Sequence, residues 1–104
     1  MIPEVKIGPL RYRVVEDYPL ISDEHQMLYG EICYSEGEIK VDSRSNSSLK
    51  PVILWHEMLH GILSMAGVEV ANEDQVIEAI SHGIVMVLQD NPDLYPFTVG
   101  KAGE

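Results

Sequence analysis

The chain has 104 residues, of which 45% are hydrophobic and 23% charged, so it is long enough for one globular domain with a single core. Lys and Arg together number 7 against 17 Asp and Glu, which gives a formal net charge of -10. This excess of carboxylates argues against nucleic acid and anionic membrane surfaces as partners, because both are bound by clustered basic side chains. We therefore expect neither a nucleic-acid nor a membrane partner.

The remaining composition predicts a cytoplasmic protein. Cys33 is the single cysteine and excludes an intramolecular disulfide. The first 20 residues hold several charged side chains and no apolar run of the kind found in signal peptides. No stretch approaches the roughly 18 apolar residues of a membrane helix. We expect one domain over residues 1–104, with a loosely held tail at 93–104.

The N-terminal half is predicted to form strands and turns. Alternating apolar residues at 5–15, interrupted by Gly8-Pro9, predict a bent or edge strand. Residues 17–24 are expected to form a loop that leads into a short helical turn at 24–28. Two short β-rich runs around a glycine-containing turn predict a hairpin at 29–42.

The first of two predicted helices follows the polar loop at 43–48, where Ser47 or Ser48 is expected to cap it. Pro51 suits its opening turn, and Gly67 is a natural stop. Its apolar stripe at helical spacing consists of Val52, Trp55, Leu59, Ile62, Leu63 and Ala66.

The second predicted helix begins at Asn72, with Gln75 as its capping-box partner, and ends at Asn91-Pro92. Glu73 and Asp74 suit its first turn, where the helix dipole favours negative charge. Its predicted apolar face consists of Val76, Ile77, Ile80, Ile84, Val87 and Leu88. The predicted fold class is α+β, with a small, mainly antiparallel three-stranded sheet packed on two helices.

The motif that carries chemistry is His56-Glu57-Met58-Leu59-His60, an H-E-x-x-H sequence on the first predicted helix. Residues four apart lie on one helix face, so both imidazoles can reach one metal ion. Glu57 is offset by one residue and can accept a proton from a water molecule at the metal without binding the metal itself. A catalytic zinc ion takes three protein ligands and keeps one open position, so the motif requires a third ligand.

Three residues of the second predicted helix are candidates for this ligand, because Asp74, Glu78 and His82 form a row at a spacing of four residues. Glu78 ranks first, since it follows His60 by 18 residues, enough for a turn and a helix that packs back across the first. His82 ranks second and is also a candidate for stabilising an oxyanion. Asp74 ranks third, because a capping role is expected for it.

The motif followed by Glu78-Ala79 resembles the ImmA/IrrE-type zinc metallopeptidases, especially their short phage- and prophage-encoded members. The resemblance covers residues 39–91 and implies a minimal zincin-like core. It implies that His56, His60 and Glu78 bind zinc and that Glu57 is the general base. It also implies that Ile39–Asp42 is the edge strand against which an extended substrate lies, and that the substrate is a regulatory protein of the repressor kind.

The favoured function is therefore zinc-dependent hydrolysis of a peptide bond in a protein or peptide substrate. Zinc polarises the scissile carbonyl, Glu57 deprotonates water, and His82 or one of Tyr12, Tyr29 and Tyr34 stabilises the oxyanion. The alternative is a non-catalytic protein-binding module on the same scaffold, with a structural metal or none. The sequence gives no indication of an oligomeric state.

Overall fold

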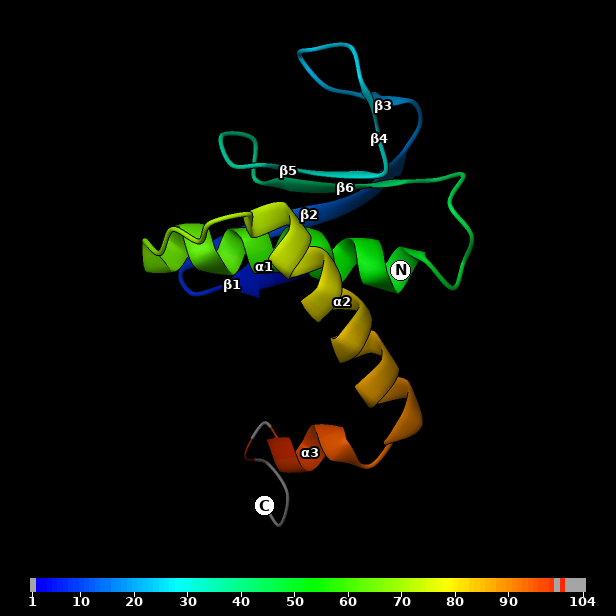
Figure 1. Ribbon diagram of the computed structural model, residues 1–104, viewed down its shortest axis with the longest axis vertical. Coiled ribbons are helices and arrows are strands. Elements are labelled where there is room, and N and C mark those ends of the chain that lie inside the picture. Colours follow the sequence, from blue (N-terminus) through cyan, green and yellow to red (C-terminus); the bar gives the residue numbers. More distant parts are fainter. Residues whose placement is uncertain (1, 99, 101–104) are drawn as a thin grey trace.

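Residues 5–15, expected to form a bent or edge strand, belong to two antiparallel strands because the chain reverses at Gly8. This glycine has φ +57°, a left-handed conformation that a side chain disfavours. The strands are β1 (Glu4–Ile7) and β2 (Leu10–Asp17), and Glu4 lies opposite Arg13 in their register. The computed structural model describes residues 2–98 and 100 (Figure 1).

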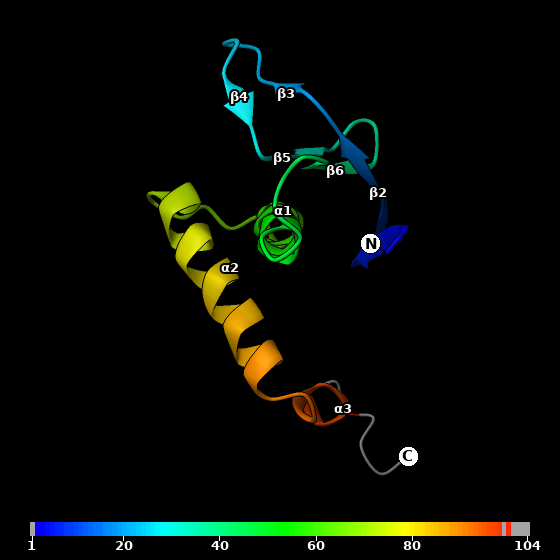
Figure 2. The same cartoon turned by 90° about the vertical axis from the view of Figure 1, so that its right-hand side faces the viewer.

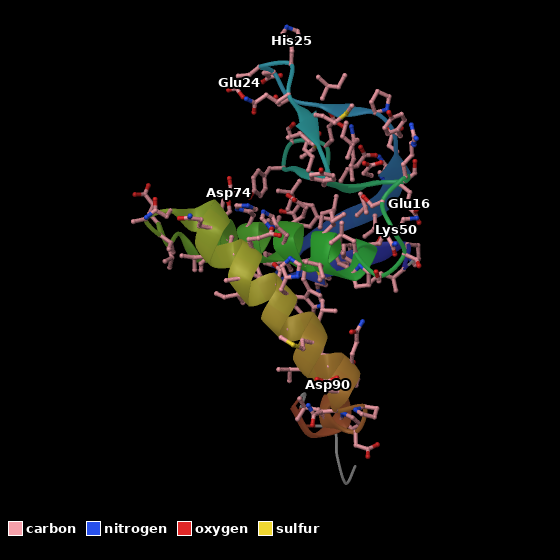
Figure 3. All side chains as sticks on the ribbon, turned by 45° about the vertical axis from the view of Figure 1, so that its right-hand side comes forward. Glu16, Glu24, His25, Lys50, Asp74 and Asp90 are labelled. Carbon is pink, nitrogen blue, oxygen red and sulfur yellow. The ribbon has the colours of Figure 1, made fainter. Side chains whose placement is uncertain are left out.

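The next segment forms a small two-stranded sheet of β3 (Leu20–Ile21) and β4 (Met27–Leu28), and it projects from the main sheet (Figures 1 and 2). The helical turn predicted at 24–28 is therefore wrong. The hairpin closes locally, because the Ser22 carbonyl accepts from the N–H of His25 and the Ser22 N–H donates to the Gln26 carbonyl. His25 adopts φ +62° at the tip of this hairpin and is exposed, well away from Asp74 (Figure 3).

The predicted hairpin at 29–42 is confirmed as β5 (Gly30–Cys33) and β6 (Glu38–Asp42). The main sheet has four strands in the order β1-β2-β6-β5, and β2 runs parallel to β6. The α+β class is confirmed, but the predicted mainly antiparallel sheet of three strands is not, because the sheet has four strands and is mixed. The intervening residues 18–37 provide the long connection that a parallel pair requires.

The sheet order also corrects the predicted edge strand. Ile39–Asp42 belongs to β6, which lies inside the sheet between β2 and β5, and both Ile39 and Val41 are completely buried. The prediction that it forms an edge is wrong, because β2 occupies its second side. The edge that lies along the first helix is β5.

Helix α1 (Lys50–Ala66) has a different beginning from the one predicted. Neither Ser47 nor Ser48 caps it, and the turn before it is closed by Asn46, whose side-chain oxygen accepts from the Ser48 N–H. The predicted end is confirmed, since Gly67 adopts φ +70° and its N–H donates to the Ser64 carbonyl.

Helix α2 (Glu73–Asp90) ends before Asn91 as predicted, but the predicted capping box is absent, because Asn72 adopts φ +55° and makes no side-chain cap. The helix crosses α1 with its N-terminal part and then extends away from it to the short helix α3 (Leu94–Thr98) (Figures 1 and 2). The tail predicted to be loose at 93–104 thus contains a helix, and residues 99 and 101–104 lie outside the described part. None of the described helices is long and apolar enough to cross a membrane.

The core lies between the sheet and α1. Its buried cluster joins Ile7, Tyr12 and Ile39 from three strands with Leu54 from the helix. Gly61 permits the close approach, because a Cβ there would lie 2.9 Å from Ile7 Cδ1. Helix α1 thus packs directly on the sheet, and the side of α1 turned toward α2 carries the two histidines of the motif.

Candidate metal centre

The two histidines of the motif lie side by side on α1, one turn apart. The ring centroids of His56 and His60 are 4.9 Å apart, and their Nε2 atoms are 3.1 Å apart. Both rings are largely buried, with side-chain exposures of 17% and 18%. Two imidazole nitrogens this close point toward a shared centre, which is the arrangement that the motif predicts.

The first turn of α2 adds a carboxylate to this pair. The Oδ1 atom of Asp74 lies 2.8 Å from Nε2 of His60 and 3.4 Å from Nε2 of His56. Three nitrogen and oxygen ligands of a tetrahedral zinc ion stand roughly 3.3 Å from one another, because each lies about 2.0–2.2 Å from the ion. His56, His60 and Asp74 form the group of three that could hold a metal ion among residues 2–98 and 100.

Two further carboxylates bind the opposite nitrogens of the rings. Nδ1 of His56 lies 2.8 Å from Oε2 of Glu78, and Nδ1 of His60 lies 2.6 Å from Oε2 of Glu73. A carboxylate at Nδ1 holds the proton on that nitrogen and leaves Nε2 with a free lone pair. The rings are thereby oriented with their Nε2 atoms toward Asp74, as metal-binding histidines commonly are.

The structure differs from the predicted order of third ligands. Asp74, ranked last, faces the two Nε2 atoms, whereas Glu78, ranked first, lies on the far side of the His56 ring. His82 is half-exposed, and its Nε2 lies 3.0 Å from Oε1 of Glu78, so the structure does not bring it to the histidine pair. The reason is how the helices cross, because the first turn of α2 places Asp74 at the Nε2 atoms and the next turn places Glu78 at Nδ1 of His56.

Glu57 is turned toward the sheet and is 8% exposed. Its Oε2 lies beside Gly30 of β5, where an added Cβ would be 3.1 Å from it. Burial raises the pKa of Glu57, and the charges of His56 and His60 oppose this effect without cancelling it. A carboxylate with a raised pKa is a better proton acceptor than an exposed one and can also return the proton.

Burial and the neighbouring negative groups have opposite effects on the pKa of His60. Burial disfavours the protonated ring, but the hydrogen bond with Glu73 and the charges of Glu57 and Asp74 outweigh it, so the pKa of His60 is raised. Negative groups thus surround the ring on several sides. The same groups would favour any cation at this place, whether a proton or a metal ion.

A cavity of about 660 Å³ opens in front of the cluster. His56, Glu57, His60 and Asp74 contribute to one part of its wall. Of the three tyrosines considered as oxyanion donors, Tyr29 and Tyr34 line this cavity, whereas Tyr12 is buried in the core. A ligand of moderate size can therefore reach the cluster from solvent.

The free edge of β5 borders the same cavity. The N–H of Asp42 donates to the carbonyl of Tyr29, so these two residues form a hydrogen-bonded pair of the antiparallel ladder. Such pairs alternate along the ladder, and the backbone N–H and C=O groups of Gly30 and Ile32 therefore point away from β6. They are available to pair with another extended chain.

Two residues of the site were not predicted for the roles they have here. Glu73 lies in the first turn of α2, where it was expected to serve the helix dipole, and it also contacts His60. Gly30 was not singled out, although a glycine within a strand is a known sign of close backbone approach. A Cβ at Gly30 would lie 2.6 Å from Ile53 Cγ2. This glycine lets β5 lie directly on α1 beside Glu57.

Comparison of the chain with protein-family models, with curated proteins and with solved structures finds no match. No family or solved fold therefore assigns a role to these residues. What they can do chemically follows from their types, contacts and burial.

Proposed function

We propose that the protein is a zinc-dependent peptidase. The observation that carries the proposal is the convergence of His56 Nε2, His60 Nε2 and Asp74 Oδ1, which lie 2.8–3.4 Å from one another at the wall of a cavity. Glu57 lines the same wall, which is the position required of a proton acceptor. Such a site combines a cation, a general base and room for a substrate.

His56, His60 and Asp74 would hold the metal, and their donor set of two imidazoles and one carboxylate suits zinc. Zinc held there would supply a Lewis acid for the scissile carbonyl and would lower the pKa of water. Glu73 and Glu78 would keep the rings in the orientation that binds the metal, by accepting from Nδ1 of each ring.

Glu57 would accept the proton of the attacking water and pass it to the leaving amine. Its burial supports this role, because a raised pKa allows the carboxylate to act first as a base and then as an acid. The outward N–H and C=O groups of Gly30 would align an extended substrate beside Glu57 by adding a strand to β5.

The proposal extends to the class of protein. The H-E-x-x-H motif followed by Glu78-Ala79 on a second helix resembles the ImmA/IrrE-type metallopeptidases with their zincin-like core, which would make a regulatory protein of the repressor kind the substrate. The position of the cluster supports an enzyme over a structural zinc site in a binding module. A structural site is closed by a fourth protein ligand, whereas this group of three borders the cavity.

Zinc content and peptide hydrolysis test the proposal together. The purified protein should bind one zinc ion, measured by mass spectrometry of the metal, and His56→Ala or His60→Ala should lose it. His25→Ala is the matched control, because His25 is exposed at the hairpin tip away from the cluster. Glu57→Gln should keep zinc and lose hydrolysis of a denatured protein substrate. Equal hydrolysis by wild type and Glu57→Gln would refute the role of Glu57 as the base.

A further inference from the structure

The cavity continues along α1 beyond the histidine pair. Its floor follows one face of the helix from Leu49 through Val52 and Ile53 to His56 and His60. This distance along the helix axis is about 16 Å, because an α-helix rises about 1.5 Å per residue. Extended chain rises about 3.3 Å per residue, so the floor is as long as roughly five residues of a bound peptide.

The end of the cavity near Leu49 is apolar. Strand β5 runs alongside α1, with Gly30 beside Ile53 and Ile32 beside Gly61. The residues before Gly30 therefore lie over the beginning of the helix. These are Met27, Leu28 and Tyr29, and all three line the cavity. They line the cavity together with Leu49 and Val52.

The side chains of Met27 and Tyr29 are large and are not part of the core. Met27 is 59% exposed and Tyr29 is 67% exposed, and both lie beside the cavity rather than under the sheet. Val52 on the floor is buried. A large apolar side chain of a bound peptide would cover Met27 and Tyr29 and would itself leave water, which favours binding.

The cavity is lined by acidic side chains and by no Lys or Arg. The acidic residues are Glu31, Glu57, Asp74 and Glu78. A bound divalent ion would balance two of these four charges and leave the cavity negative. The whole chain adds to this field with its net charge of -10. Positively charged peptides would be attracted, and acidic ones repelled.

We propose that the cavity selects extended, positively charged segments that carry a large apolar side chain two to three residues from the bond that is cleaved. The separation follows from the roughly 6 Å along α1 between Val52 and His56 and the roughly 9 Å between Val52 and the middle of the histidine pair, because extended chain rises about 3.3 Å per residue. This inference rests on the proposed peptidase function and names its substrate class. It assigns the choice of substrate to β4 and the beginning of α1, and the chemistry to the end of the cavity near His60.

Binding to the zinc-loaded Glu57→Gln variant tests the selection without relying on hydrolysis. The probes are fluorescein-labelled peptides of twelve residues built from Gly, Ser and Lys, with Leu, Phe or Ser at one central position. A second set replaces each Lys with Glu. Fluorescence anisotropy should show the Leu and Phe peptides binding at least tenfold more tightly than the Ser peptide. The Lys set should bind more tightly than the Glu set, by a factor that shrinks as salt is added.

Two substitutions in the same hairpin make a matched pair. Met27 and Ile21 are cross-strand neighbours of β4 and β3 and are similarly exposed, but Met27 lines the cavity and Ile21 does not. Met27→Ser should reduce the preference for Leu over Ser several-fold, whereas Ile21→Ser should leave it unchanged. Both positions are exposed, so neither change removes a core contact.

The outcomes separate this inference from the proposed function. Equal binding of the Leu and Ser peptides, or equal effects of Met27→Ser and Ile21→Ser, would overturn the inference even if wild type hydrolyses peptides. A clear preference for apolar and basic peptides, with no hydrolysis of them by zinc-loaded wild type, would support the selection and overturn the proposed peptidase. Preference together with hydrolysis near the apolar residue supports both.

Discussion

The carboxylate of Glu78 lies 2.8 Å from Nδ1 of His56, on the opposite side of the ring from the Nε2 atom that faces Asp74. Asp74 and Glu78 are one turn apart on α2, so a single helix face reaches both sides of one imidazole. The first carboxylate is placed to bind a metal ion, and the second is placed to orient the ring that binds it.

Because of this difference in position, substitutions of Asp74 and of Glu78 should weaken zinc binding to different extents. Asp74→Ala removes a proposed ligand and should weaken zinc binding by more than 100-fold. Glu78→Ala removes only the partner of Nδ1 and should weaken zinc binding by about 10–100-fold, as losses of such outer partners do. Competition with a chromophoric zinc chelator at constant pH measures both affinities.

Asp90→Ala is the control for this pair, because Asp90 is an exposed acidic residue at the far end of α2 (Figure 3). It tests whether the loss of negative charge alone changes zinc affinity and should have little effect. If Glu78→Ala abolished zinc binding and Asp74→Ala left it nearly intact, Glu78 would be the ligand, as the sequence alone predicts.

Zinc should also stabilise the folded protein. A ligand that binds only the folded state adds about 2.7 kcal/mol of stability at 100 times its dissociation constant. In a domain of this size that gain raises Tm by roughly 10 °C. Thermal unfolding monitored by circular dichroism, with zinc and with EDTA, measures the shift. A shift of the same size in the His56→Ala, His60→Ala double variant would place the binding of zinc elsewhere in the chain.

The spacing of the motif was sufficient to predict the histidine pair, because residues four apart share a helix face whatever surrounds them. The choice between Asp74 and Glu78 was not predictable in this way. Both lie on the same face of α2, and which one reaches Nε2 depends on where α2 crosses α1. The loop of 67–72 sets that crossing, and no periodicity describes it.

The side of α1 that faces the sheet could not be predicted from the sequence pattern either. This helix is apolar on most sides, so helical spacing alone selects several equally good stripes. The predicted stripe includes Val52, which is buried, but also Trp55, Leu59 and Ile62, which are not. It omits four other buried residues, Ile53, Leu54, Glu57 and Gly61. The close approach at Gly61 and at Gly30 determines this choice, and it buries the very glutamate that the chemistry needs. The parallel pairing of β2 with β6 depends on contacts between distant segments in the same way.

Gly30 is predicted to tolerate no side chain. In Gly30→Ala the new Cβ would lie 2.6 Å from Ile53 Cγ2 and 3.1 Å from Glu57 Oε2, so β5 must shift away from α1. We expect a loss of about 1–3 kcal/mol in the free energy of unfolding, measured with urea. Hydrolysis should fall as well, because the shift moves both the edge of β5 and Glu57.

Gly83→Ala provides the comparison for this experiment. A Cβ at Gly83 would meet nothing within 4 Å, and the residue lies inside α2. Alanine favours the helix by up to about 1 kcal/mol over glycine, so this variant should be as stable as wild type or slightly more stable. Equal destabilisation by the two changes would show that close packing is not the reason for glycine at position 30.

The thiol of Cys33 is predicted to react slowly. Burial raises its pKa from 9.0 to about 11, and the hydrogen bond to Glu31 Oε1 at 3.3 Å adds to the rise. Because the thiolate is the reactive form, a pKa raised by about two units lowers its fraction at pH 8 by about 100-fold. Alkylation by iodoacetamide, followed by mass spectrometry, should be slower than that of the urea-unfolded chain by roughly tenfold or more, because the greater nucleophilicity of a thiolate with a higher pKa offsets part of its lower fraction.

The pH dependence identifies the cause of this slow reaction. With a raised pKa, the alkylation rate should keep rising about tenfold per pH unit past pH 9, where an ordinary thiol levels off. Glu31→Gln removes the negative charge next to the sulfur and should therefore lower the pKa of Cys33 and speed alkylation at pH 8. A rate that levels off near pH 9 and is unchanged in Glu31→Gln would mean that restricted access of the reagent, and not the pKa of the thiol, protects Cys33.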